Sequence, residues 1–284
     1  MDQKIINLFD AFTHGGMNRR EFLDKLSRLA GSTTAAMALL PVLENNYAHA
    51  QMVPEDDARL VTGMEKASDT MSGYLARPKD MTAKLPAVLV IHENRGLNPH
   101  IKDVARRLAL DGFIAFAADY LTPWGGTPED ADKARDLIGT LKPEAILANS
   151  IVAVKAAAGF EGSNGKVGAV GFCWGGGQVN ALAASGDPSL SAGVAYYGRQ
   201  ADAAQVPMIK APLLLHYASL DERINAGIAA YEEALKTNGK TYELHIYEGA
   251  NHAFNNDTNA ARYDKKAADL AWGRTVKFLR KHLA

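Results

Sequence analysis

From residue 86 onward, short apolar runs alternate with segments of helical periodicity, and this alternation restricts the fold more than any other feature of the sequence. The first run, Pro86 to Ile91, is entirely apolar, as expected for a strand buried on both faces. The next segment has apolar residues at positions 101, 104, 105, 108 and 109, which lie on one face of a helix. Alternating strands and helices form parallel sheets with right-handed crossovers. The sequence therefore predicts an α/β fold with a doubly wound, mostly parallel sheet and helices on both faces.

The same pattern continues to the end of the chain. Strands are expected over residues 86–91, 113–118, 166–171, 191–197, 212–217 and 241–247. Helices are expected over residues 101–110, 128–141, 143–158, 175–184, 224–237 and 260–283. Two earlier segments, 60–64 and 70–76, are expected to be short antiparallel edge strands. No repeat or linker divides the later part of the chain, so residues 51–284 are predicted to form one domain.

The first fifty residues differ from the rest. Two adjacent arginines lie between Asn18 and Leu23, a weakly apolar stretch follows as far as Leu43, and residues 48–50 read Ala-His-Ala. These features resemble a twin-arginine export signal with its small-x-small cleavage site. They predict that residues 1–50 are a leader segment and that the protein is exported to the periplasm. The alternative is a cytoplasmic protein that retains an N-terminal amphipathic helix, packed on the domain or on a partner subunit.

Composition excludes several classes of function. The 31 Lys and Arg residues against 32 Asp and Glu give a formal net charge of -1, so the chain has no basic field for nucleic acid. The single Cys excludes an internal disulfide and a Cys-rich zinc site. No HExxH pair, phosphate loop or GxGxxG after a strand is present, so we expect neither a metal nor a cofactor. No segment approaches the roughly 20 apolar residues of a membrane span. Nothing in the pattern indicates an oligomeric state.

Three ionisable residues directly follow predicted strands, where ligands collect in open α/β sheets. Cys173 lies in Gly171-Phe172-Cys173-Trp174-Gly175, the G-x-nucleophile-x-G turn between a strand and a helix. The helix N-terminus there lowers a thiol pKa. Asp221 and His252 follow the next strands in the order nucleophile, acid, histidine that α/β-hydrolases use. We therefore predict a catalytic triad of Cys173, His252 and Asp221.

With these motifs the chain resembles the dienelactone hydrolase family (carboxymethylenebutenolidases) of the α/β-hydrolase fold, over about residues 60–284. The matching stretches are His92-Glu93-Asn94-Arg95-Gly96, Gly171-Phe172-Cys173-Trp174-Gly175-Gly176, Leu220-Asp221 and Asn251-His252-Ala253-Phe254. The resemblance implies hydrolysis of a small-molecule ester or enol-lactone through an acyl-enzyme on Cys173. It also implies that Glu93 helps to activate the thiol, because Glu93 matches a glutamate with that role in the family.

An oxyanion hole requires two backbone N–H donors, which we assign to Trp174, after the nucleophile, and to Asn94 in the earlier loop. The family binds a substrate carboxylate with arginines, one of them shortly after the catalytic histidine. That arginine has no match here. The candidates for substrate binding are Arg95, Trp124, Tyr197, Arg199 and Arg262.

Two functions of other classes also fit an accessible, low-pKa cysteine on this fold. One is a redox-sensing thiol protein, which the absence of a second, resolving cysteine disfavours. The other is a non-catalytic binding protein on the α/β-hydrolase fold, since fold alone does not settle function. The complete triad disfavours that alternative.

Overall fold

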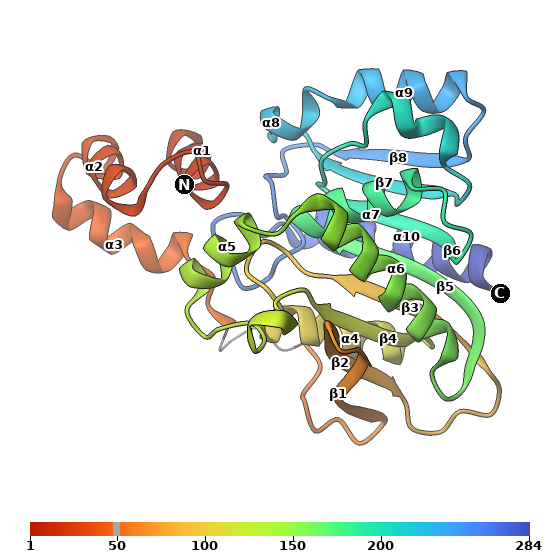
Figure 1. The fold of residues 1–284 in the computed structure, drawn as a ribbon. Helices are drawn as coiled ribbons and strands as arrows, with labels where there is room; N and C mark the ends of the chain where they lie inside the picture. The colour runs from red at the N-terminus through yellow and green to blue at the C-terminus, as the bar shows by residue number, and fades with distance from the viewer. Residues whose placement is uncertain (48–51) are drawn as a thin grey trace.

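The computed structural model describes residues 1–47 and 52–284, and within them eight strands form one sheet (Figure 1). The strands are β1 (Leu60–Ser68), β2 (Met71–Pro78), β3 (Leu85–Ile91), β4 (Ile114–Asp119), β5 (Ser163–Phe172), β6 (Leu190–Tyr196), β7 (Leu213–Ala218) and β8 (Tyr242–Tyr247). Their order across the sheet is β1-β2-β4-β3-β5-β6-β7-β8. All neighbouring pairs from β4 to β8 are parallel, whereas β2 is antiparallel to both β1 and β4. The predicted mostly parallel sheet is confirmed.

Helices cover both faces of this sheet (Figure 1). On one face pack α4 (Pro99–Leu110) and α10 (Lys265–Leu283), and on the other α6 (Pro143–Gly159), α7 (Trp174–Ala184) and α9 (Ile228–Thr237). The short α5 (Ala131–Gly139) packs beside Leu121 and Trp174 near one end of the sheet. This three-layer arrangement confirms the doubly wound fold class.

Strand β3 shows why an unbroken apolar run forms a central strand. Side chains alternate between the two faces, so Val88 and Val90 join the core under α4 and α10 while Leu89 and Ile91 join the core under α6 and α7. All four side chains are fully buried. Each such burial stabilises the fold by about 2 kcal/mol.

The single helix predicted over residues 224–237 is wrong in one respect, because it is broken into α8 (Glu222–Asn225) and α9. Gly227 lies at the break, where the side chain of Gln200 donates a hydrogen bond to the carbonyl of Ile224 at 3.1 Å. A Cβ at position 227 would lie 2.4 Å from Oε1 of Gln200. The helix therefore ends where another chain segment satisfies its carbonyl group.

The N-terminal residues form three helices rather than one: α1 (Gln3–Thr13), α2 (Arg19–Ala30) and α3 (Thr33–Leu43). They lie to one side of the sheet and share an apolar cluster of their own that includes Phe12, Phe22 and Leu26 (Figure 1). Gly31, at φ 83°, ends α2, and Ser32 caps α3. The Ala-His-Ala pattern at residues 48–50 lies outside the described residues, so the predicted cleavage site stays a prediction.

No individual helix in the described ranges combines the length and apolar character required to cross a membrane. The pairs α2 with α3 and α5 with α6 reach that composition only when each pair is taken together, and they are bent by 111° and 106°.

Candidate active site

Cys173 occupies a sharp turn between β5 and α7, in the strained conformation φ 54°, ψ -113°. The flanking glycines make this turn possible. A Cβ on Gly171 would lie 2.1 Å from the carbonyl oxygen of Gly175, and a Cβ on Gly175 would lie 2.3 Å from that of Ile91. The turn presents the sulfur of Cys173 at the N-terminus of α7, as the sequence pattern predicts.

Asp221 and His252 form a buried hydrogen-bonded pair. Asp221 follows β7, and its Oδ1 caps α8 by accepting a hydrogen bond from the backbone N–H of Ile224 at 3.2 Å. Its other oxygen, Oδ2, lies 2.5 Å from Nδ1 of His252, in the loop after β8. The carboxylate therefore holds the hydrogen of a neutral imidazole on Nδ1, and Nε2 carries the lone pair. In the part of the chain that the structure describes, this Nε2 is buried without a hydrogen-bond partner.

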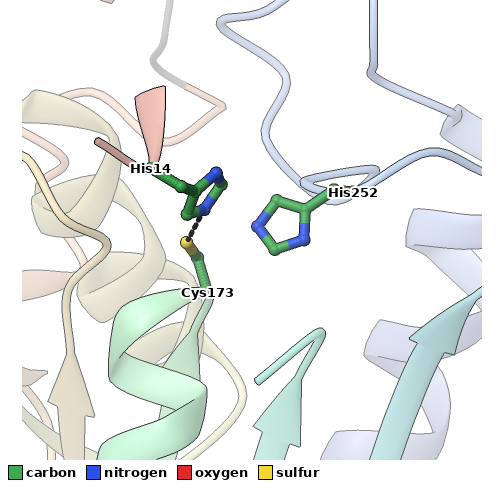
Figure 2. Close-up of side chains that lie close together, drawn as sticks. All are labelled: His14, Cys173 and His252. Carbon is green, nitrogen blue, oxygen red and sulfur yellow. Dashed lines mark hydrogen bonds between the residues drawn. The ribbon is translucent and has the colours of Figure 1, made fainter. Parts of the chain in front are cut away.

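A second histidine, which the sequence analysis missed, lies at the sulfur. His14 directly follows α1, and its Nε2 lies 3.2 Å from Sγ of Cys173. Figure 2 shows the His14 and His252 rings beside the sulfur; the ring centroids are 4.9 Å apart and the rings are perpendicular. No local sequence motif identifies His14 as a site residue, because it is separated from Cys173 by 159 positions.

The surrounding charges favour a thiolate facing an imidazolium. Burial by itself raises the pKa of Cys173, but the charges of His252 and then His14, together with the hydrogen bond to His14, lower it to about 6. Burial likewise lowers the pKa of His252, yet the carboxylate of Asp10 on α1, the thiolate and Asp221 raise it well above its ordinary value. The N-terminal helix thus contributes to the electrostatics of both groups.

The loop after β3 carries two of the predicted site residues. Glu93 is buried, and its Oε2 accepts a hydrogen bond from the side chain of Asn256 at 2.6 Å. Among the described residues, the hydrogen bond recorded for the thiol is with His14 and not with Glu93. The side chain of Asn94 donates to the carbonyl of Thr13 at 2.6 Å, which joins this loop to the end of α1.

A cavity of about 1210 Å³ opens above the sulfur. The predicted residues that line it are Asn94, Cys173, Trp174, Tyr197, Arg199 and His252. The ring of Trp174 stacks on His92 with centroids 5.2 Å apart, and the ring of Tyr197 lies 5.0 Å from that of His252. Two residues absent from the sequence analysis, His14 and Arg223, line the same cavity.

Three other candidates for substrate binding do not line that cavity. Arg95 lies 3.6 Å from the carboxylate of Asp132. Trp124 is 51% exposed in a short 3-10 turn, η2 (Thr122–Trp124), after β4. Arg262 pairs with Asp10 of α1 at 3.6 Å. The positions of these three side chains depend on how the loops pack, which the sequence pattern does not specify.

The turn at Cys173, the hydrogen-bonded pair of Asp221 and His252, and the order of these three residues along the chain agree with the match to a known family. Residues 71–283 match the model of the dienelactone hydrolase family.

The chain belongs to the dienelactone hydrolase family. A protein of Escherichia coli (strain K12) named "Putative carboxymethylenebutenolidase" is 30% identical over 243 residues, which cover 80% of this chain and 89% of that protein. A Bradyrhizobium protein named "Probable 2-oxo-3-(5-oxofuran-2-ylidene)propanoate lactonase" is 34% identical over 225 residues, 74% of this chain and 89% of that protein.

Among solved structures, one from Klebsiella pneumoniae titled "Putative Dienelactone Hydrolase" superimposes with a TM-score of 0.71 at 28% identity and covers 78% of this chain and 99% of its own. A second family model also matches this dienelactone hydrolase family member: residues 1–31, which carry α1, His14 and all of α2, match a model named YqhI-like. The protein is thus a hydrolase of this family with an N-terminal helical segment that contacts the site.

Proposed function

We propose that this hydrolase cleaves an activated carboxylic ester or an enol-lactone through a covalent acyl-enzyme on Cys173. The observation that carries the proposal is the 2.5 Å contact between Asp221 and His252 beside a strained thiol whose pKa is lowered to about 6. A nucleophile, a base and a carboxylate that orients the base are the three groups that acyl transfer requires.

In the first step, the thiolate of Cys173 attacks the carbonyl carbon and the carbonyl oxygen becomes an oxyanion. The backbone N–H groups of Asn94 and Trp174 stabilise that oxyanion, a role supported by the place of both residues on the cavity wall beside the sulfur. The ester C–O bond then breaks, a thioester forms, and the leaving oxygen takes a proton from the imidazolium of His252. In the second step, His252 removes a proton from water, which attacks the thioester and releases the thiolate and the acid.

Thiolate chemistry selects the substrate class. A thiolate leaves a tetrahedral intermediate more readily than an alkoxide does, so an ordinary alkyl ester returns to substrate. An enolate or phenolate leaves readily enough to complete the reaction. The Bradyrhizobium relative, whose printed name is that of a lactonase, agrees with an enol-lactone substrate. Arg199 and Arg223 on the cavity wall are suited to bind a substrate carboxylate.

Glu93 is proposed to assist thiol activation once substrate enters. Its carboxylate accepts a hydrogen bond from the side chain of Asn256 at 2.6 Å. For it to act on the thiol, this hydrogen bond must be exchanged when substrate binds. Export through a twin-arginine signal within residues 1–50 remains a further proposal.

The test is turnover of p-nitrophenyl acetate and of an enol-lactone by the full chain and by the variants Cys173→Ala and His252→Ala. Both variants should lose activity with both substrates. His245→Ala is the matched control, because His245 is a partly exposed histidine on β8 that lies outside the cavity lining. Unchanged rates in both active-site variants would refute the proposal, and sulfenic acid formation at low peroxide without turnover would favour the redox alternative.

A further inference from the structure

The residues around the sulfur include one group that the hydrolase mechanism does not use, His14. We propose that His14, Cys173 and His252 form a binding site for Zn²⁺, present when the chain retains its N-terminal helices, and that the bound ion blocks the nucleophile. The ligand atoms of the three residues, two imidazole nitrogens and one sulfur, all lie within 4.8 Å of one another (Figure 2).

The distances suit a tetrahedral zinc site after a small adjustment. With Zn–N near 2.0 Å and Zn–S near 2.3 Å, neighbouring ligand atoms lie about 3.3 to 3.6 Å apart. His14 Nε2 and Cys173 Sγ are already 3.2 Å apart. Bringing all three atoms to the metal therefore requires side-chain movements on the order of 1 Å. Cys and His are the ligands that zinc prefers, and three protein ligands leave a fourth position open, here toward the cavity.

In their neutral forms, the forms that bind a metal, both imidazoles present a lone pair to the common centre. On His14, Nε2 lies 3.1 Å from the guanidinium of Arg223, which can only donate, so this nitrogen carries the lone pair. Its Nδ1 donates to the backbone carbonyl of Asp10 at 2.7 Å. On His252, Nδ1 faces Asp221, and Nε2 is buried with no hydrogen-bond partner among residues 1–47 and 52–284. A buried, unpartnered nitrogen is the feature that a metal would satisfy.

The groups that contact the far nitrogen of each imidazole are of the kind that supports a metal site. Each imidazole has a carboxylate behind its Nδ1: Asp221 at 2.5 Å for His252 and Asp10 at 3.3 Å for His14. These two carboxylates and the thiolate offset the charge of a divalent cation. Two positive charges lie near Asp10: Arg262 at 3.6 Å, which is buried, and Arg223 at 3.5 Å, whose side chain is 43% exposed. Arg223 can therefore turn into solvent when the ion binds.

Occupancy of this site has a clear consequence for the chemistry. The proton shared by the thiol and His252 leaves to solvent, and zinc binds both the thiolate and the freed Nε2 of His252, so neither nucleophile nor base remains free. Because His14 lies within the predicted leader, a chain cleaved after residue 50 would lack the third ligand. The inhibition rests on the hydrolase mechanism proposed above, whereas metal binding does not.

The experiment measures binding of Zn²⁺ to the full chain by competition with a chromophoric chelator, and the absorption spectrum of the Co²⁺-substituted protein. We expect one Zn²⁺ per chain and a thiolate-to-cobalt charge-transfer band that Cys173→Ala abolishes. His14→Ala should weaken Zn²⁺ binding by about 100-fold or more, since loss of even an outer-shell partner costs about 10- to 100-fold. The control His245→Ala should bind as the parent does.

His14→Asn, examined together with far-ultraviolet circular dichroism, separates loss of a ligand from unfolding of α1. Inhibition of p-nitrophenyl acetate turnover by Zn²⁺, measured against each variant's own metal-free rate, should weaken in parallel with binding. Absence of bound Zn²⁺, a cobalt spectrum without the thiolate band, or equal affinity in His14→Ala and the parent would overturn the proposal. Zinc binding without any turnover would instead refute the hydrolase mechanism and leave the metal site standing.

Discussion

The thiol of Cys173 should ionise near pH 6, about three pH units below the ordinary thiol pKa of 9.0. At pH 7 such a thiol is about 90% thiolate, whereas an ordinary thiol is about 1% ionised. The three-unit shift in pKa corresponds to about 4 kcal/mol in the free energy of ionisation. A thiolate of lower pKa is also a weaker nucleophile, by about 20-fold over this range. The two effects partly cancel and leave a rate at neutral pH only about 4-fold higher, so the midpoint of the pH profile is the decisive quantity.

The assay is the rate of alkylation by iodoacetamide between pH 4 and pH 10. It reports one site, because the chain contains a single cysteine. The rate should rise through a midpoint near pH 6 and level off above pH 7, since a lowered pKa makes the thiolate available at lower pH. His252→Ala should move the midpoint upward, and His14→Ala should do so to a smaller extent, in the order of their effects on the thiol. A rate that still rises between pH 8 and pH 9 in the parent protein would refute this reasoning.

Three further predictions follow from the site and its scaffold. Asp221→Asn keeps an oxygen that can cap α8 but cannot hold the imidazole in its working tautomer, so kcat should fall by on the order of 10³- to 10⁴-fold with an unchanged circular dichroism spectrum; a rate equal to that of the parent would contradict the triad. Gly175→Ala places a Cβ 2.3 Å from the carbonyl of Ile91 and should lower stability by about 1 to 3 kcal/mol in calorimetry, whereas Gly177→Ala, whose Cβ meets nothing closer than 3.6 Å, is the control and equal melting temperatures would contradict the close packing. N-terminal sequencing of protein from a periplasmic fraction should begin at or near Gln51, and a chain that starts at Met1 in the cytoplasm would refute export.

Local patterns predict most of the sheet and the nucleophile. The run at β3 is recognisable because every residue in it is apolar, and the turn at Cys173 is recognisable because glycine is required on both sides of it. The order of the strands and the antiparallel placement of β2 against β4 are not local properties. They depend on which strands meet across the sheet.

The contacts missed by the sequence analysis all join distant segments. His14 reaches the sulfur because α1 lies over the loops that follow β3 and β8, where its residues meet Asn94 and Asn251. No periodicity or spacing in residues 1–17 encodes that contact. Arg262 was expected near substrate but pairs with Asp10 instead, for the same reason.

The central claim is that Cys173 carries an acyl group during turnover. Mass spectrometry of the full chain, quenched in acid shortly after mixing with p-nitrophenyl acetate, tests it most directly. The account predicts one added acetyl group on the peptide that contains Cys173, formed in a burst and more persistent in Asp221→Asn, where deacylation is slowed. Turnover without an adduct, or with the acetyl group on a different residue, would contradict it.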